Sequence, residues 1–335
     1  MDKIIFNEAS TENYNAGHKA RVDVVRIAKK MGFCEMDVSF TISNQNAISK
    51  AIKYLSFGVN VRKIKDSIII LQHPCRRLMD VLKIFKRNAK TIIIVHDVDG
   101  LRYNNKKLLE REVKEFNKAD VLIVHNKRMR IELERVGVTS SMIELQLFDY
   151  LMDHDNLERE GKGQGICFAG NIDKSKFIFK LPNEMVEYGV NLYGVKSDNC
   201  KLDERINYFG ARSSESLPDE ISGEYGLVWD GDDIDLCGGL VGHYLEYNNP
   251  HKLSLYCAAA MPVIVWEKSA VVDFVVNNGI GFSVSSLNEV VDKIKKINNV
   301  NYASMKNNLN QLSKAVRQGK YMKDALGKAI NMIER

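Results

Sequence analysis

The sequence predicts an α/β protein with two doubly wound, Rossmann-like domains. The chain has 335 residues, more than one hydrophobic core usually organises. Short apolar runs alternate with amphipathic helical patterns, which is typical of βαβ units with a buried parallel sheet. A polar, glycine-containing segment, DHDNLEREGKGQG at residues 153–165, separates two sets of these runs. We therefore expect domains at residues 1–152 and 166–300, joined by this linker.

The first domain has six candidate strands and two clear helical patterns. The helices are expected at Ala20–Met31 and Lys106–Phe116. The strands are expected at Lys3–Phe6, Met36–Phe40, Ser67–Leu71, Thr91–Val95, Val121–Val124 and Met142–Gln146.

The second domain repeats this rhythm, with helices from Pro250 and from about Ser286, and further helices over residues 301–335. Ligands bind at the carboxyl ends of strands in open α/β sheets, so the two domains are expected to face a central cleft. The strands are expected at Ile166–Ala169, Val190–Tyr193, Ile206–Phe209, Gly226–Trp229, Pro262–Val265 and Gly281–Val284.

The composition predicts a cytoplasmic globular protein. Hydrophobic residues make up 45% and charged residues 27% of the chain. No apolar run approaches the ~20 residues that span a bilayer, and the N-terminus lacks a signal-peptide core. The six cysteines are scattered without a CxxC pair, which argues against zinc. A net charge of +5 is too small to indicate a nucleic-acid partner.

The stretch from Tyr247 to Trp266 predicts a helix start followed by a buried strand. Asn249 suits the N-cap and Pro250 the first helical position. Lys252 then lies beside the free N–H groups and the positive end of the helix dipole, where a diphosphate would fit. A well-capped surface helix is the alternative.

The segment His96-Asp97-Val98-Asp99-Gly100 directly follows a predicted strand, at the edge where catalytic groups of α/β proteins gather. A carboxylate there could accept a proton from an acceptor hydroxyl. Asp97 is our first choice of base, followed by His96 and Asp99. The alternative is an Asp-Gly turn that satisfies its own backbone.

Residues Asn15, Gly17 and Lys19 follow the first strand and form either a substrate loop or a plain turn. The chain has no GxGxxG, so a nicotinamide cofactor loses its main support. No cofactor is expected.

In the second domain, Lys174 and Lys176 follow the first strand and could neutralise a phosphate, although lysines are also common in solvated turns. Asp230-Gly231-Asp232 is a DxD segment that could bind a metal. We favour a loop and no metal, because the lysines and the helix start already serve the phosphates.

The segment from Cys75 to Lys90 predicts a basic amphipathic helix. Its apolar face is expected to pack on the sheet, and its basic face would also suit contact with anionic lipid at the membrane.

With these residues laid out, the chain resembles the bacterial β-1,6-galactofuranosyltransferases of O-antigen assembly. More distantly, it resembles the glucosyltransferases that extend glycans on streptococcal serine-rich adhesins. The likeness covers nearly the whole chain. It is carried by residues 16–17, 19–21, 96–99, 101–102, 148–151, 169–171, 229–232 and, above all, 244–245, 248–252 and 254–256.

This resemblance implies a GT-B fold in which the first domain binds the acceptor and the second binds a UDP-sugar, with no required metal. It also implies a C-terminal helix, within Tyr302–Arg335, that crosses back to the first domain. Tyr193, Gly194, Phe209 and Trp229 lie at strand ends near the expected uridine and ribose site.

The resulting hypothesis is an inverting transfer of galactofuranose from UDP-galactofuranose to a lipid-linked glycan, in the biosynthesis of a surface polysaccharide such as lipopolysaccharide O-antigen. A UDP-glucose-dependent transferase acting on a protein-linked glycan remains an alternative. A non-catalytic glycan-binding or complex-stabilising partner is another. The sequence leaves open whether the chain forms a homo-oligomer.

Overall fold

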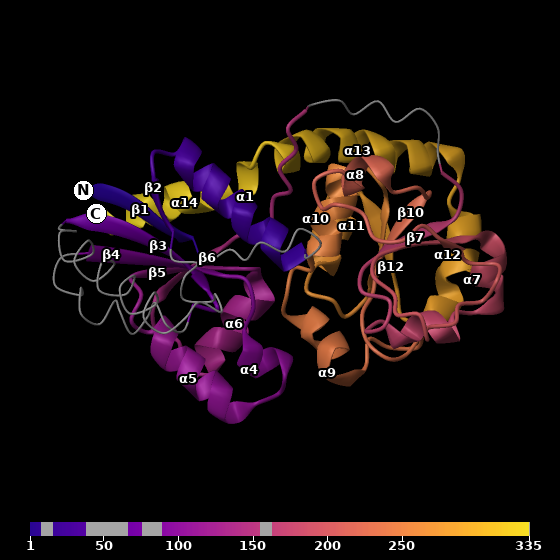
Figure 1. The fold of residues 1–335 in the computed structure, drawn as a ribbon, viewed down its shortest axis with the longest axis horizontal. Helices are drawn as coiled ribbons and strands as arrows, with labels where there is room; N and C mark the ends of the chain where they lie inside the picture. The colour runs from indigo at the N-terminus through magenta and orange to yellow at the C-terminus, as the bar shows by residue number, and fades with distance from the viewer. Residues whose placement is uncertain (8–15, 38–65, 76–88, 155–162, 335) are drawn as a thin grey trace. The chain divides into compact units, whose positions relative to one another are not determined.

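The structure, a computed structural model, describes residues 1–7, 16–37, 66–75, 89–154 and 163–334. The chain divides into two compact units (Figure 1). Unit 1 comprises Met1–Leu145 with Tyr321–Arg335, and unit 2 comprises Gln146–Lys320. In its described part, each unit carries a six-stranded sheet with parallel pairing throughout.

The sheet of unit 1 has the strand order β2-β1-β3-β4-β5-β6. The order reverses between β1 and β3, which makes the carboxyl ends of these strands the switch point of a doubly wound sheet. All seven residues of β3 are buried, as expected for a strand covered on both faces. Five of the six strand predictions are confirmed, and the sixth, Met36–Phe40, overlaps β2 only at Met36 and Asp37, with residues 38–40 outside the described part of the chain. The bounds are β1 (Asp2–Asn7), β2 (Cys34–Asp37), β3 (Ser67–His73), β4 (Ala89–Val95), β5 (Val121–Val124) and β6 (Ser141–Glu144).

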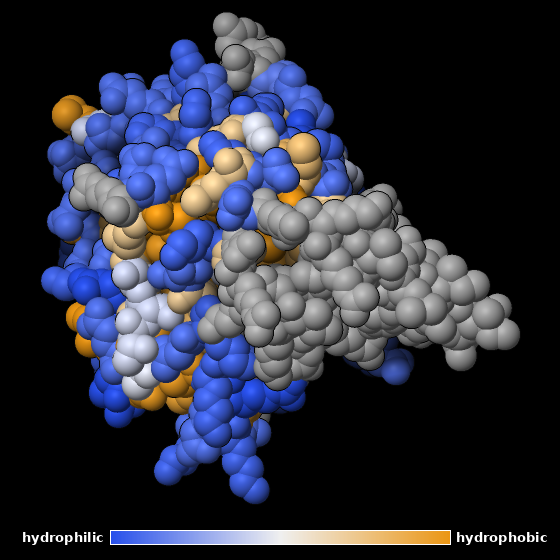
Figure 2. All heavy atoms as spheres, turned by 90° about the vertical axis from the view of Figure 1, so that its left-hand side faces the viewer, coloured by the Kyte–Doolittle hydropathy of each residue, from blue (hydrophilic) through white to orange (hydrophobic). Residues whose placement is uncertain are grey.

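Helices cover both faces of this sheet. Figure 1 shows α1 and α14 on one side and α5 and α6 on the other. Among the described residues in Figure 2, hydrophilic side chains surround a central band of hydrophobic ones. The bounds are α1 (Ala16–Lys30), α4 (Asp99–Arg102), α5 (Lys106–Phe116), α6 (Lys127–Arg135) and α14 (Lys320–Ile333).

Two predicted segments lie largely outside the described residues. These are the basic helix at Cys75–Lys90, of which residues 76–88 are not described, and the linker, of which residues 155–162 are not described.

The sheet of unit 2 has the order β12-β11-β10-β7-β8-β9 and reverses between β7 and β10. Its six predicted strands are also confirmed, although the edge strand β9 pairs over only two residues instead of four. The bounds are β7 (Ile166–Ala169), β8 (Val190–Tyr193), β9 (Asn207–Tyr208), β10 (Tyr225–Val228), β11 (Val263–Trp266) and β12 (Gly281–Val284).

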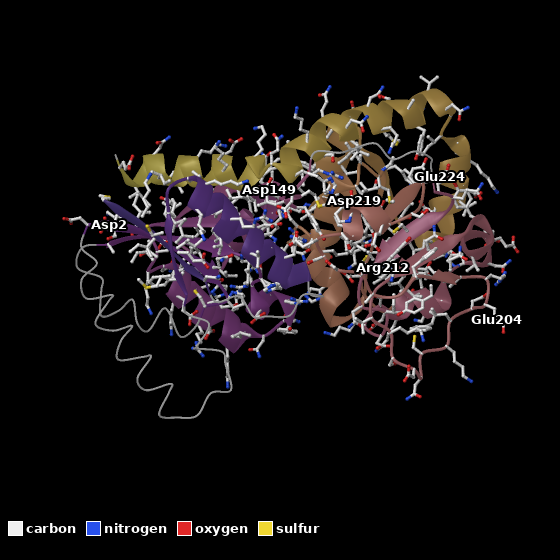
Figure 3. The ribbon with its side chains drawn as sticks, turned by 45° about the horizontal axis from the view of Figure 1, so that its top comes forward. Asp2, Asp149, Glu204, Arg212, Asp219 and Glu224 are labelled. Carbon is white, nitrogen blue, oxygen red and sulfur yellow. The ribbon has the colours of Figure 1, made fainter. Side chains whose placement is uncertain are left out.

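The helices of unit 2 include α13, which packs on α10. Asp219 of α8, labelled in Figure 3, contacts His154 at 2.9 Å and Arg317 of α13 at 3.5 Å. The bounds are η2 (Lys176–Lys180), α7 (Asn183–Tyr188), α8 (Leu217–Glu220), α9 (Gly239–Gly242), η3 (His243–Glu246), α10 (His251–Ala258), α11 (Val272–Asn277), η4 (Leu287–Glu289), α12 (Val290–Lys296) and α13 (Asn299–Arg317).

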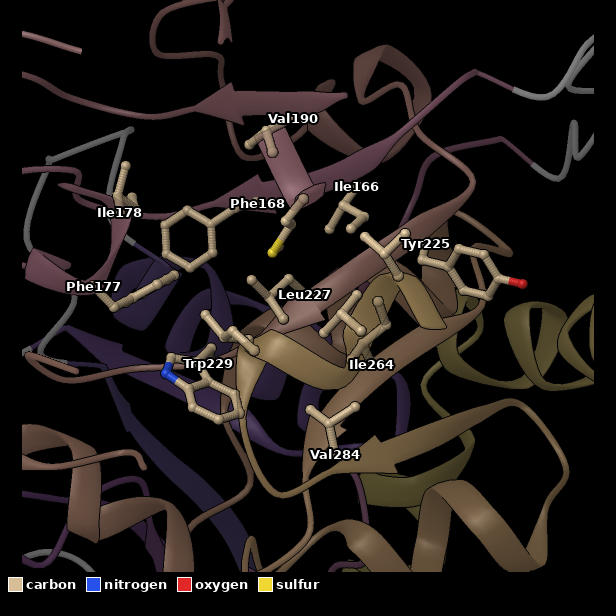
Figure 4. Close-up of a cluster of buried hydrophobic side chains, with 14 of the residues drawn as sticks. Ile166, Phe168, Phe177, Ile178, Val190, Tyr225, Leu227, Trp229, Ile264 and Val284 are labelled. Carbon is tan, nitrogen blue, oxygen red and sulfur yellow. The ribbon is translucent and has the colours of Figure 1, made fainter. Parts of the chain in front are cut away.

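The core of unit 2 contains side chains from its central strands and from the segments that follow them (Figure 4). Phe168 and Phe177 pack edge to face, with ring centroids 5.2 Å apart. Trp229 is fully buried in this cluster. In the described part of the chain, every helix is too short or too polar to span a membrane.

Candidate functional site

Unit 2 places Lys252 at the carboxyl ends of β7 and β10, beside the switch point of its sheet. The Lys252 ammonium lies 2.8 and 3.0 Å from the two carboxylate oxygens of Asp230. Asp230 is the second residue after the end of β10. The ammonium also lies 5.2 Å from the ring centroid of Phe168 in β7. The lysine side chain is only 17% exposed, so this charge is held in a defined place.

The helix that carries Lys252 begins one residue later than predicted. Pro250 is the N-cap, with an extended ψ of 135°, and no side chain caps the helix. The predicted N-cap role of Asn249 is therefore wrong. Asn249 lies one residue before the N-cap and is buried. Its side-chain amide donates a hydrogen bond to the Gln146 carbonyl at 3.0 Å. The residue still fixes the entry into α10.

Two glycines bring the loops at the ends of β7 and β8 together. A Cβ at Gly194 would lie 1.7 Å from the carbonyl oxygen of Gly170, and Gly194 has φ of +141°. Gly170 in turn lies against Lys252, since a Cβ there would come within 3.1 Å of the lysine Cε. The predicted donor residues Gly194 and Lys252 therefore share one loop cluster.

The predicted lysines of the β7 loop lie at its exposed surface. The backbone N–H of Lys174 donates to the Asn171 side chain at 3.0 Å, which closes a turn. The Lys176 ammonium lies 3.8 Å from Asp232 and its side chain is 66% exposed, so this ion pair stabilises the fold little. In the described ranges, no three His, Cys, Asp or Glu side chains gather as a metal site.

Among the predicted aromatic residues, Phe209 presents the accessible ring. Phe209 is 40% exposed and stacks on Tyr193 with centroids 4.9 Å apart. The buried Tyr193 hydroxyl accepts from the Ser222 N–H at 3.0 Å, which fixes the Tyr193 ring beneath Phe209. Trp229 is different: its indole N–H donates to the Asp233 carbonyl at 2.9 Å and its ring lies in the core. We assign Trp229 to the core rather than to a donor site.

Tyr256, which the sequence analysis did not select, pins β7 to β10. Its hydroxyl accepts from the Ala169 N–H at 3.0 Å and lies 3.3 Å from the carbonyls of Cys167 and Leu227. The ring passes over Gly226, where a Cβ would come within 2.3 Å of it. The residue fixes the two strand ends that carry the Gly170 loop and Asp230.

In unit 1, Asp97 follows β4 at the carboxyl edge of the sheet. Arg102 donates to its Oδ2 at 3.1 Å, and in the described residues no hydrogen bond reaches Oδ1. Burial raises the pKa of Asp97 to about 6, against the opposing charge of Arg102 and with a smaller contribution from Asp99. A carboxylate with this pKa is ionised at neutral pH and is a better proton acceptor than an ordinary aspartate.

The neighbours of Asp97 are held by hydrogen bonds. His96 pairs through Nε2 with the Gln72 side chain at 2.8 Å. Asp99 is the first residue of α4. His125 donates from Nε2 to the Val95 carbonyl at 2.9 Å, and burial lowers the pKa of His125 to about 4, so the ring is neutral.

The predicted substrate loop at Asn15, Gly17 and Lys19 needs correction. Gly17 and Lys19 lie inside α1, which starts at Ala16, four residues before the predicted helix. The Lys19 side chain is 1% exposed, and its ammonium pairs with Asp23 at 2.8 Å, one helical turn away. Asn15 lies outside the described residues. Lys19 is therefore a buried helical residue, not a loop cation.

Profiles of a known family match both units. The glucosyltransferase 3-like N-terminal domain matches residues 2–147, and the glucosyltransferase 3-like C-terminal domain matches residues 166–329. The β-1,6-galactofuranosyltransferase WbbI of Escherichia coli K12 is 29% identical over 331 residues, covering 97% of each chain. Glucosyltransferase 3 of Streptococcus parasanguinis is 26% identical, covering 92% of this chain and 91% of that protein.

Solved structures support the same fold. Anabaena HepE, solved with UDP and glucose, is similar with a TM-score of 0.65 at 11% identity, over 99% of this chain and 100% of that one. A glycosyltransferase from Rickettsia africae is similar with a TM-score of 0.62 at 12% identity, over the whole of both chains. The chain is a GT-B hexosyltransferase that belongs to the glucosyltransferase 3-like family.

Proposed function

We propose that this enzyme transfers galactofuranose from UDP-galactofuranose to a hydroxyl of a lipid-linked glycan, with inversion to a β-linkage. The observation that carries the donor half is the Lys252 ammonium, held beside the N-terminus of α10 at the switch point of unit 2. A fixed cation and a helix dipole there would stabilise the charge of a departing diphosphate. HepE, a structural neighbour, was solved with UDP and glucose.

In this proposal, Asp97 supplies the base. Its carboxylate takes the proton of the acceptor hydroxyl as the hydroxyl oxygen attacks the anomeric carbon. The bond from that carbon to the diphosphate breaks on the opposite face, so UDP leaves with the bonding electrons. One displacement inverts the anomeric centre and gives the β-linkage.

The choice of galactofuranose rests on the Escherichia coli relative, whose name states β-1,6-galactofuranosyl transfer and which aligns over 97% of the chain. The lipid-linked acceptor, a role in surface polysaccharide synthesis in the cytoplasm and contact with anionic membrane are further parts of the proposal.

A UDP-glucose-dependent transfer to a protein-linked glycan is the second candidate. Two streptococcal relatives named glucosyltransferase 3, each 26% identical, favour it. Incubation with a panel of UDP-sugars, including UDP-galactopyranose with a mutase that forms the furanose, separates the two. UDP release that depends on the mutase supports galactofuranose, whereas release from UDP-glucose alone would replace that donor.

Substitution of Lys252 tests the donor site. Lys252→Ala is expected to lower turnover at least about tenfold and to weaken UDP binding, because a charge-assisted contact to the phosphates is lost. Calorimetry with UDP and a UDP-release assay measure both effects. Lys201→Ala, at an exposed lysine of the same unit, is the control. Unchanged kinetics and UDP affinity in Lys252→Ala would refute the donor site.

Substitution of Asp97 tests the base. Asp97→Asn is expected to abolish transfer while UDP still binds, and Asp2→Asn, at an exposed aspartate, should leave transfer unchanged. Transfer by Asp97→Asn at the wild-type rate would move the base to another residue.

A further inference from the structure

Glu112 is a buried carboxylate that the proposed chemistry does not use. It lies on α5 and is 1% exposed. Burial of a carboxylate is costly unless its oxygens find partners. Its partners lie at the ends of two strands of the sheet.

The first two partners are backbone groups directly after Asp97. Glu112 Oε1 accepts from the Asp99 N–H at 2.9 Å, and Oε2 accepts from the Gly100 N–H at 2.8 Å. These N–H groups open α4, whose N-cap residue Val98 provides no side-chain hydrogen bond. The Glu112 carboxylate of α5 thus caps the N-terminus of α4.

The third partner belongs to the neighbouring strand. Glu112 Oε1 lies 3.2 Å from Nε2 of His73, the last residue of β3. The His73 ring is fully buried and packs edge-on against Phe116, one turn farther along α5, with centroids 4.7 Å apart. Glu112 therefore connects the carboxyl ends of β3 and β4 through a single side chain.

Close packing leaves this connection little freedom. A Cβ at Gly100 would lie 2.4 Å from the Leu109 Cα, so α4 and α5 touch backbone to backbone. On the other side of Asp97, His125 holds the Val95 carbonyl. The segment with Asp97 is thus anchored at both ends.

We propose that Glu112 is a positioning residue for Asp97, which it fixes through the N–H groups of Asp99 and Gly100. This inference rests on the proposed role of Asp97 as the base. A base must meet the acceptor hydroxyl within hydrogen-bond distance, and small displacements lower the rate steeply. Glu112 touches no substrate in this scheme; it sets where Asp97 points.

Glu112→Gln is the main test. The amide keeps the size of the side chain, but its NH₂ group faces the backbone N–H of either Asp99 or Gly100, and two donors cannot form a hydrogen bond. One of the two hydrogen bonds is lost, and the segment that carries Asp97 loosens. Turnover is expected to fall at least about tenfold while UDP affinity stays unchanged. More water would then reach the partly exposed Asp97 carboxylate, so its pKa falls from about 6 toward 3.8 and the acid limb of kcat/KM moves to lower pH. Arg102, Arg21 and Asp99, whose charges also act on Asp97, are not altered by this substitution, whereas His73, which acts on Asp97 too, exchanges a carboxylate partner for an amide.

Glu115→Gln is the matched control. Glu115 lies on the same helix, is 7% exposed and pairs with Arg111 at 3.1 Å. The same change there should leave turnover and the acid limb at their wild-type values. Glu112→Asp, which retains the charge on a shorter side chain, is a second variant should Glu112→Gln fail to fold. It is expected to lower turnover and shift the acid limb in the same direction.

Wild-type turnover with an unmoved acid limb, in either folded Glu112 variant, would overturn the proposal. A Glu115→Gln variant with the same losses would do so too, since the effect would then come from any change on α5. Asp97→Asn in the same assay separates the two ideas. If it is inactive while the Glu112 variants are active, only the positioning role falls; if it transfers normally, the base assignment itself falls.

Discussion

Asp97 combines partial burial with one arginine contact, and this combination sets the pH range in which it can act. With a pKa of about 6, it is ionised at neutral pH and protonated below pH 6. We expect kcat/KM to fall with a slope of one below about pH 6, because the protonated carboxyl accepts no proton. A pH profile of UDP release measures this. Asp99→Asn should retain this limb, displaced somewhat to lower pH because the Asp99 charge helps to raise the pKa of Asp97. A profile flat down to pH 4.5 in the wild type would contradict the prediction.

The same carboxylate is expected to reduce the stability of the fold. The folded state favours the protonated carboxyl, because its pKa lies above 3.8. The fold therefore has the full benefit of this protonation below pH 3.8 and loses it as pH rises through 6. The shift corresponds to at most about 3 kcal/mol, and solvent screening at this 32% exposed side chain reduces it to about 1–2 kcal/mol.

Asp97→Asn should therefore raise the free energy of unfolding at pH 7.5 by about 1 kcal/mol while it removes activity. Urea unfolding at pH 7.5 tests this. A less stable variant would indicate that the Arg102 contact outweighs the burial of the charge.

Asp230 neutralises the lysine that is proposed to meet the diphosphate. Asp230→Asn removes a negative charge from beside the phosphate position, so UDP is expected to bind several-fold more tightly. Calorimetry with UDP measures the change, with Asp198→Asn at an exposed aspartate of the same unit as control. Weaker UDP binding would show that Asp230 acts mainly by holding the ammonium in place.

At the scale of elements, α13 fixes the C-terminal end of α10. The Ala258 carbonyl accepts from Ser313 Oγ and Arg317 Nε, both at 2.8 Å, and the Ala260 carbonyl accepts from Lys306 Nζ at 2.6 Å. These donors satisfy carbonyls that have no partner within the helix, and two of them carry the positive charge that suits this end.

Arg317→Met should lower the free energy of unfolding by about 1–3 kcal/mol, because it takes a charged donor from Ala258 and a partner from Asp219. Chemical denaturation compares it with Lys314→Met, an exposed position on the same helix. Equal stability of the two variants would contradict this role of α13.

The central strands were predictable because buried parallel strands appear as continuous apolar runs such as Ile92–Val95, whereas the edge strands β2 and β9 carry no such run. Helix starts were less predictable. The start of α10 depends on the extended ψ of Pro250 and on a long-range contact of Asn249 with Gln146. The start of α1 depends on first-turn residues that resemble a loop in composition.

The places of the two main proposed site residues were predictable from their order along the chain, since Asp97 follows β4 and Lys252 lies in the first turn of α10. Their partners were not, because Glu112 and Asp230 meet them only in the folded chain. One signal was present: Glu112 lies four residues before Phe116 and three after Leu109, so a charge falls on the apolar stripe of α5.

At the scale of the whole molecule, His125 is expected to lower stability in mild acid, against a smaller and opposite contribution from Asp97. Burial lowers the pKa of His125 to about 4 from an ordinary 6.5, so its contribution is complete above pH 6.5 and is lost as pH falls toward 4. At pH 5 this loss amounts to about 2 kcal/mol.

Urea unfolding at pH 7.5 and pH 5 tests this by comparing the wild type with His125→Gln, which cannot titrate. The variant should lose less stability between the two pH values by about 2 kcal/mol. Equal losses in the two proteins would show that His125 does not govern the acid response.

The contact of Tyr256 with Gly226 also limits how this chain can change. A side chain at position 226 would occupy the space of the tyrosine ring. Removal of the ring would in turn release the Ala169 N–H at the end of β7. Positions 226 and 256 are therefore epistatic. A mutational library that varies either one alone is expected to return mostly destabilised variants, and engineering of the proposed donor site should treat the pair as one unit.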